Sequence, residues 1–318
     1  MPGARRSGPR PSASRGGRGE GRPSAKARTA EPSDRPRAFI VGAGRVGGSL
    51  AMALPDVGVD VLGAWTRRPG SAARVRRKLG LRCSSGRLPD ALSHADMVFL
   101  TVPDDAVEPV CRDLAREGLI GRGQDVIHCS GCLGLSVLGA AEEAGASVGS
   151  LHPLAAFMDP RSAGRVFHGS LALVEGGSPA VTRRLRALAS GLGMKPARLS
   201  GPREEAGERR ALYHAAAVTA AAGVLSTMDL ALEAGRAAGL SRREALEGLV
   251  ALARGTLDNL ERSKVTSKAL TGPVARGDER VVRRHLAVLG RLSKGARRLY
   301  RELSRRAEEI ARTRPEAS

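Results

Sequence analysis

Two histidines have the side chains and settings that acid–base chemistry on a small substrate needs. His152 follows an expected strand in the segment SLHPL, and His214 lies early in a long helical pattern, in YHAAAV. A carbonyl or imine that receives a hydride needs a proton or hydrogen-bond donor at its developing charge, and histidine titrates near neutral pH. We therefore expect both to be donors. The alternative is that each is a hydrogen-bonded structural residue at a domain junction.

An arginine in a conformationally restricted loop is the third candidate. The segment TGPVARGD, residues 271–278, lies between two helical patterns and contains Arg276. A guanidinium can bind a carboxylate through two parallel hydrogen bonds, so Arg276 is a candidate anchor for an acidic substrate. Alternatively, Arg276 and Asp278 only order the loop and cap the next helix.

A glycine turn near the start of the chain supplies the cofactor chemistry. Gly42, Gly44 and Gly47 form a GxGxxG pattern between the apolar run AFIV and an Ala- and Leu-rich helical pattern. The first glycine permits a tight turn, the second lets backbone approach a pyrophosphate, and the third permits close packing of helix on strand. The helix N-terminus adds unpaired N–H groups. The residues expected to hold the pyrophosphate are Gly42, Ala43, Gly44, Arg45, Val46 and Gly47.

The residues after the second expected strand indicate which dinucleotide binds. Thr66, Arg67 and Arg68 lie about 20 residues beyond the glycine turn, where an NAD site carries an acidic residue. Two guanidinium groups suit the 2′-phosphate of NADP instead. The sequence therefore predicts NADP as cofactor, unless both arginines are ordinary surface residues.

Two further strand ends should approach the ribose and nicotinamide. Val102, Pro103 and Asp104 follow one strand, and Ser130 follows the next. Ligands of open α/β sheets bind beyond the carboxyl ends of the strands, near the point where the strand order reverses. Asp104 or Asp105 could equally cap the helix that follows.

A metal site is a weaker interpretation of the same region. Cys129 and Cys132 have ligand spacing, and His128 and His152 could complete a tetrahedral set. However, His128 and Cys129 are adjacent in an expected strand, so their side chains should point to opposite faces. We therefore expect no metal.

These residues need a sheet to position them, and the pattern of elements provides one. Strands are expected at residues 38–41, 59–65, 81–84, 97–102, 125–129, 147–151, 171–175 and 195–199, with helices between most of them. One such helix is expected at 135–144, and Ser178 and Pro179 should open another. This alternation predicts an α/β fold with a doubly wound parallel sheet and helices on both faces.

An all-helical region should follow the sheet. Helices are expected at residues 206–235, at 242–262 after a Ser241–Glu244 capping box, and at 278–313 with a break near Gly290 or Gly295. Residues 211–234 are apolar but contain polar interruptions, so we expect a buried core helix rather than a membrane span. The expected domains are 38–202 for the cofactor and 203–318 for substrate and dimerisation.

Most of the net charge of +20 lies in the two ends of the chain. Residues 1–37 carry 10 basic and 3 acidic groups, residues 280–318 carry 12 and 4, and 46 of the 52 basic residues are Arg. Residues 1–37 have almost no large apolar side chain, so we expect a disordered basic tail without a signal sequence. Base-reading motifs and stacking aromatics are missing from the sequence, so we expect no specific nucleic acid partner, no membrane and a cytoplasmic protein with free thiols.

Several segments together resemble a known family. FIVGAGRVG, TVPDDAV, HCSG, SLHPL, YHAAAV and LTGPVARGD occur in this order, and resemble bacterial proteins with a Rossmann-like domain before a domain of unknown function catalogued as 2520. That family is similar to 6-phosphogluconate dehydrogenase, pyrroline-5-carboxylate reductase and F420-dependent NADP reductase, and some relatives are described as ketopantoate reductases. The resemblance implies an NADP-binding fold and a helical domain that often forms dimers.

The resemblance also indicates one departure. Related dehydrogenases carry a Lys early in the corresponding helix, where His214 stands here, and an Asn further along, where this chain has Ala220, Ala221 and Ala222. We expect an NADP-dependent oxidoreductase that reduces a small carbonyl or imine, such as the keto acid ketopantoate, and forms a homodimer. The alternative is a regulatory protein that binds NADP without turnover.

Overall fold

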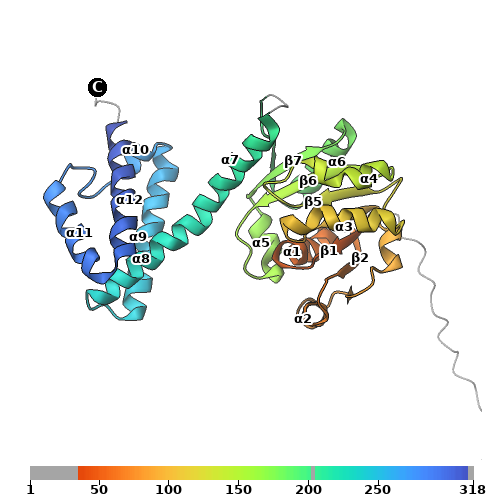
Figure 1. Ribbon diagram of the computed structural model, residues 1–318, viewed down its shortest axis with the longest axis horizontal. Helices are drawn as coiled ribbons and strands as arrows, with labels where there is room; N and C mark the ends of the chain where they lie inside the picture. The colour runs from red at the N-terminus through yellow and green to blue at the C-terminus, as the bar shows by residue number, and fades with distance from the viewer. Residues whose placement is uncertain (1–34, 202–204, 314–318) are drawn as a thin grey trace, which may run out of the picture. The chain divides into compact units, whose positions relative to one another are not determined.

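The computed structural model describes residues 35–201 and 205–313, and its core is one eight-stranded sheet (Figure 1). The strand order is β3-β2-β1-β4-β5-β6-β7-β8. The strands are β1 (Arg37–Val41), β2 (Asp60–Trp65), β3 (Cys83–Ser84), β4 (Met97–Leu100), β5 (Asp125–His128), β6 (Ser147–Leu154), β7 (Leu171–Gly176) and β8 (Lys195–Ala197). The winding reverses between β1 and β4, which is where such sheets bind ligands.

The predicted α/β class is confirmed, with one antiparallel pair. All neighbouring strands are parallel except β6 and β7. The chain passes from β6 to β7 through two short helices that the sequence analysis missed, η4 (Pro160–Ser162) and α5 (Ala163–Phe167). Because antiparallel strands need no crossover helix, this short connection suffices to reverse the chain.

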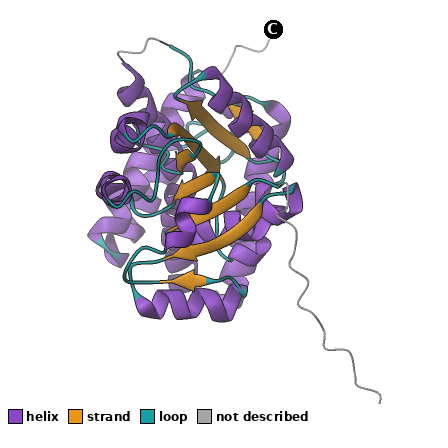
Figure 2. Ribbon diagram, turned by 90° about the vertical axis from the view of Figure 1, so that its right-hand side faces the viewer, coloured by secondary structure: helices purple, strands orange, loops and turns teal. Residues whose placement is uncertain are grey.

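Helices cover both faces of the sheet (Figure 2). Alternate strand residues such as Ile40 and Ile127 pack in one core cluster with α1 (Arg45–Ala53), α2 (Pro69–Leu79), α5 and α6 (Pro179–Gly191). Their neighbours Phe39 and Val126 pack in a second cluster with α3 (Asp104–Arg116) and α4 (Gly139–Glu143). The alternation of side chains along each strand thus produces two separate cores.

Several local predictions are confirmed and one is refined. Ser178 caps α6 by accepting a hydrogen bond from the Val181 N–H, as predicted. The helix expected at 135–144 is a 3₁₀ turn, η3 (Leu135–Leu138), followed by the five-residue α4. Two further 3₁₀ turns, η1 (Leu54–Val57) and η2 (Asp90–His94), complete this part of the chain.

The remainder is helical, as predicted. One continuous helix consists of α7 (Ala206–Val218), the π-helical turn η6 (Thr219–Gly223) and α8 (Val224–Ala237), followed by α9 (Arg242–Ser263), α10 (Thr266–Ala269), α11 (Glu279–Leu292) and α12 (Lys294–Arg312). The Ser241–Glu244 capping box of α9 is present. The break expected near Gly290 or Gly295 falls at Ser293, which caps α12, because a serine cap ends one helix and starts the next.

Two predicted boundaries fall on residues outside the described ranges. The domain boundary at 202–203 lies in the gap 202–204, and most of the expected tail, residues 1–34, also lies outside.

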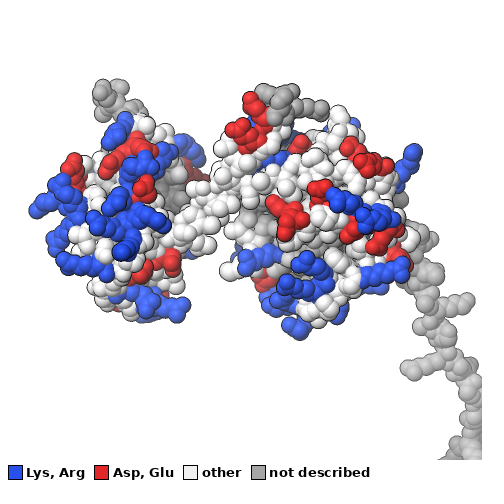
Figure 3. Space-filling model, viewed as in Figure 1, with Lys and Arg blue, Asp and Glu red and all other residues white. Residues whose placement is uncertain are grey.

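The prediction of a buried core helix at residues 211–234 is wrong. None of the most apolar window of Ala206–Ala237 is buried, and Leu212 and Leu225 are 64% and 71% exposed. Residues 211–228 of this helix carry no charged side chain, and Figure 3 shows this part in white. By length and composition alone, the helix is apolar enough to cross a membrane. Hydropathy predicts that an apolar helix is buried, but it does not tell whether the contacts come from the same chain or from another molecule.

Candidate cofactor and active site

The glycine turn has the geometry that its sequence predicts. Gly42 adopts a φ of +99°, and its N–H donates to the Trp65 carbonyl at 2.8 Å, which joins the turn to β2. A Cβ on Gly47 would collide with the Thr101 side chain and the Gly42 carbonyl. A Cβ on Gly44, in contrast, would have nothing within 4 Å. Gly44 therefore faces open space at the N-terminus of α1, as a phosphate site requires.

A cavity of about 900 Å³ opens from this turn. It is lined by Gly42, Ala43, Gly44, Arg45, Trp65, Thr66, Arg67, Arg68, Ser71, Arg74, Val75, Lys78, Leu79, Thr101, Val102, Pro103, Asp105, Ala106, Val110, Met158, Asp159, Pro160 and Arg161. The structure thus brings most of the predicted cofactor residues into one space, although Val46, Gly47, Asp104 and Ser130 do not line it.

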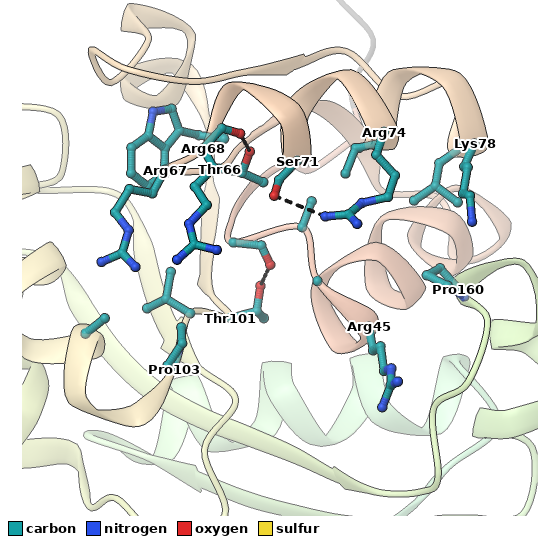
Figure 4. A pocket seen from close by; sticks show the side chains of 18 of the residues that line it. Arg45, Thr66, Arg67, Arg68, Ser71, Arg74, Lys78, Thr101, Pro103 and Pro160 are labelled. Carbon is teal, nitrogen blue, oxygen red and sulfur yellow. Dashed lines mark hydrogen bonds between the residues drawn. The ribbon is translucent and has the colours of Figure 1, made fainter.

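Positive side chains surround the cavity (Figure 4). Arg67 and Arg68 extend from the end of β2 on one side, and Arg74 and Lys78 extend from α2 on the other. Arg74 donates to the Ser71 hydroxyl at 3.2 Å. The sequence analysis missed Ser71, Arg74 and Lys78, although their i, i+3, i+7 spacing places them on one face of a helix that begins at the cavity. This set of donors suits a ligand with several phosphates.

The ends of β4 and β5 are joined by one side-chain hydrogen bond. The Ser130 hydroxyl donates to the Asp104 carboxylate at 2.8 Å and accepts from the N–H groups of Cys132 and Leu133 at 3.1 Å. Asp104 and Asp105 lie in the first turn of α3, where neither caps the helix through its side chain. The capping alternative therefore does not hold, and Asp104 instead fixes the turn after β5.

The two predicted histidines lie close together, with a tyrosine that the sequence analysis did not select. His152 Nδ1 lies 2.9 Å from the Tyr213 hydroxyl, and the two rings meet edge to face at 5.5 Å. The ring of His214 lies 6.4 Å from that of His152. The cluster therefore joins the end of β6 to the middle of α7. A single tyrosine in a helical pattern gives no local signal of such a contact.

A row of polar side chains, buried except for Glu175, lies beside this cluster. His128, Ser150 and Glu175 are register partners on β5, β6 and β7, and Arg210 of α7 forms an ion pair with Glu175. Only 4% of the Arg210 side chain is exposed. The Glu175 side chain is 45% exposed, so the pair is partly buried. It ties α7 to β7, and removing Glu175 would leave the buried Arg210 guanidinium without its partner.

Burial controls the protonation of His128 and His152. It lowers the pKa of His128 to about 4, assisted by the positive charge of Arg210. It lowers the pKa of His152 to about 4 as well, with His214 and Arg210 adding to the effect and Asp104 opposing it. Both imidazoles are therefore neutral at neutral pH. Burial also raises the pKa of Tyr213.

The metal interpretation gains no support from the geometry. Cys129 packs in the core cluster that contains Ile127, whereas His128 faces Arg210 on the other side of the sheet. Burial raises the pKa of Cys129 to about 12, which keeps the thiol protonated. Across residues 35–201 and 205–313, no group of three His, Cys, Asp or Glu side chains is arranged around a metal position.

Arg276 lies in the loop before α11, and its N–H donates to the Pro273 carbonyl at 3.2 Å. Asp278 caps α11 by accepting from the Val281 N–H at 3.1 Å, which confirms the capping alternative for that residue. A role for Arg276 in carboxylate binding stays a prediction.

Two family models match successive parts of the chain. Residues 24–153 match the family described as "Rossmann-like domain", and residues 170–307 match "Domain of unknown function (DUF2520)". These are the two domains, in the same order, that the sequence resemblance implies. A search of curated proteins finds no match.

Solved structures share the fold. A protein from Bacteroides fragilis, described as a candidate NADP oxidoreductase, superposes with a TM-score of 0.69 at 22% identity, over 86% of this chain and 98% of that one. Plasmodium falciparum pyrroline carboxylate reductase with NADP bound gives 0.54 at 12% identity, over 87% and 98%. An imine reductase from Pseudomonas sp. gives 0.56 at 17% identity, over 87% and 98%.

Proposed function

We propose that this chain, in which a Rossmann-like domain precedes the DUF2520 domain, is an NADP-dependent reductase of a small carbonyl or imine substrate. The observation that carries the proposal is the single cavity that joins the glycine turn to Arg67 and Arg68. The neighbours described as NADP oxidoreductase, pyrroline carboxylate reductase and imine reductase support the same reaction class.

The residues present fit NADP. Open space above Gly44 and the N-terminus of α1 accommodate the pyrophosphate. Arg67 and Arg68 supply charged donors for the 2′-phosphate, and the end of β2 carries no carboxylate that would repel it. NADPH, when bound, supplies the hydride.

The chain's own part of the reaction is binding, orientation and proton supply. The rings of Tyr213 and His214 both lie against that of His152 at the end of β6, and this cluster can donate a hydrogen bond to the oxygen or nitrogen that gains charge. Arg276 is the proposed anchor for the carboxylate of a keto acid such as ketopantoate. The helix α7 positions two of the three ring side chains, and the Arg210–Glu175 ion pair fixes that helix to β7.

We also propose that a second copy of the chain covers the exposed apolar surface of α7 and α8. Residues 211–228 contain no Lys, Arg, Asp or Glu. Lipid does not suit this segment, because Tyr213 contacts His152 at one end and α8 packs on α9 at the other. A cytoplasmic homodimer buries the same side chains against protein.

A substrate screen tests the proposed reaction. The purified chain is mixed with NADPH and with small keto acids, ketopantoate among them, or cyclic imines, and NADPH absorbance is followed. We expect oxidation with at least one compound, and slower oxidation with NADH. Tight NADPH binding without turnover of any compound would support a regulatory protein that only binds NADP.

A further inference from the structure

The chain has two tyrosines, and the hydroxyl of each forms a hydrogen bond with a histidine Nδ1. Tyr213 lies 2.9 Å from His152 Nδ1, and Tyr300 lies 2.7 Å from His285 Nδ1. Both ring pairs meet edge to face, with centroids 5.5 Å and 5.7 Å apart. The hydrogen bond alone therefore does not distinguish a functional pair from a structural one, and the surroundings must do so.

Only the first pair adjoins the ends of the sheet strands. A Cβ added to Gly131 would lie 2.9 Å from His152 Nε2, so His152 contacts the turn after β5. That turn begins at Ser130, whose hydroxyl donates a hydrogen bond to Asp104 just after β4. His285 and Tyr300, in contrast, belong to α11 and α12. Tyr213 thus lies beside the strand ends where the reactive part of a bound dinucleotide is expected.

The surroundings also decide which group of the cluster can release a proton. Burial, and after it the nearby His214 and Arg210, disfavour a positive charge on His152 and lower its pKa. A neutral imidazole with its proton on Nδ1 donates to the Tyr213 oxygen. The tyrosine O–H is then free to point away from His152. In this arrangement the phenol is the group that can protonate a substrate, and the imidazole holds it in place.

We propose that the Tyr213 hydroxyl is the proton donor of the reduction and that His152 is its positioning residue. This assignment rests on the proposed function. The substrate carbon gains a hydride from NADPH, and the electron pair of its C=O or C=N bond moves to the oxygen or nitrogen. That atom takes the proton from Tyr213. The phenolate regains a proton from water through His152, whose Nδ1–H moves to Tyr213 while Nε2 accepts another.

Single substitutions separate this role from a structural one. Tyr213→Phe keeps the ring and removes the O–H, so kcat should fall about 10²- to 10⁴-fold with the Kd for NADPH unchanged. Tyr300→Phe is the matched control, with kcat and Kd both unchanged. His152→Gln should lower kcat less and shift the decline of rate at high pH, because that decline reports ionisation of Tyr213. Thermal unfolding of each variant checks that the fold persists.

A spectroscopic measurement tests the placement without any substrate. Tyr300→Phe leaves Tyr213 as the one tyrosine of the chain, so tyrosinate absorbance reports its ionisation directly. Saturating NADP⁺ should shift that titration if Tyr213 adjoins the nicotinamide, whereas Tyr213→Phe, which retains Tyr300, should show no shift.

The outcomes distinguish the two proposals. Full turnover by Tyr213→Phe, or bound NADP⁺ that leaves the Tyr213 titration unchanged, would overturn the role of Tyr213 alone. Failure of the unsubstituted chain to oxidise NADPH with any substrate would instead contradict the proposed function.

Discussion

Thr101 and Gly42 are joined by a hydrogen bond that fixes the glycine turn against β4. The Thr101 hydroxyl donates to the Gly42 carbonyl at 2.7 Å, and the Thr101 N–H donates to the Val41 carbonyl at 2.8 Å. A Cβ on Gly42 would lie 2.8 Å from the Thr101 backbone. The glycine turn is therefore shaped by the neighbouring strand and not only by its own glycines.

Substitutions at two glycines of the turn should affect different properties: one the stability of the fold, the other NADPH binding. Gly47→Ala places a methyl group against Thr101 and 2.9 Å from Ile40 Cγ2, so it should lower the free energy of unfolding by about 1–3 kcal/mol. Gly44→Ala meets no protein atom within 4 Å, so stability should hold while NADPH binding weakens. Urea unfolding and fluorescence titration measure the two quantities. A stable Gly44→Ala variant that binds NADPH normally would argue against phosphate contact at this turn.

Replacing Arg67 and Arg68 together with Ala should weaken NADPH binding about 10- to 100-fold, the loss expected for one or two charge-assisted hydrogen bonds. NADH lacks the 2′-phosphate, so its Kd should change little. Arg77→Ala is the control, because Arg77 is an exposed residue of the adjacent helix α2, outside the cavity lining. Equal losses for both dinucleotides would remove this role from the arginine pair.

The sheet, the glycine turn and the cavity residues at the strand ends could be predicted because their signals are local. The run Ala38–Val41 before Gly42 identifies a buried strand, and strand ends of a doubly wound sheet converge at one edge. Arg67 and Arg68 follow from their distance along the chain from the glycine turn. For such features, the spacing of residues along the sequence is enough to predict where they lie in the fold.

The remainder depends on contacts between distant segments. Tyr213 and His152 are separated by 61 residues, and Arg210 and Glu175 by 35, so no periodicity reveals either pair. The antiparallel β7 depends on two short helices with little apolar periodicity. The exposure of Leu225 was missed for a different reason: its sequence favours burial, and a partner outside the chain can provide it.

Stability should fall as the pH drops from about 6.5 to about 4. His128 is fully buried, and its pKa of about 4 lies below the value near 6.5 of an unfolded histidine. The unfolded chain therefore binds more protons in this interval, and the free energy of unfolding decreases with falling pH. At about 1.4 kcal/mol per pKa unit the loss is roughly 2–3 kcal/mol. His152 contributes with the same sign.

Urea unfolding between pH 7 and pH 4.5 measures this slope. His128→Gln should flatten it, whereas His94→Gln, at an exposed position, should leave it unchanged. A slope that does not respond to His128→Gln would show that other groups produce the acid sensitivity.

Leu225→Glu should convert the proposed dimer to a monomer. Leu225 is 71% exposed on α8, and a carboxylate at a buried interface position is strongly unfavourable without a partner. Leu225→Ala shortens the side chain without adding charge and should weaken the dimer less. Light scattering over a range of concentrations gives the mass. A monomer for the unsubstituted chain would contradict the proposed partner.

The most direct test is calorimetric titration of the unsubstituted chain with NADPH and with NADH. We predict saturable binding of one NADPH per chain, about 10- to 100-fold tighter than NADH, because the proposed site places the 2′-phosphate against Arg67 and Arg68. A folded protein that binds neither dinucleotide at millimolar concentration would contradict the central claim that the glycine turn binds a dinucleotide.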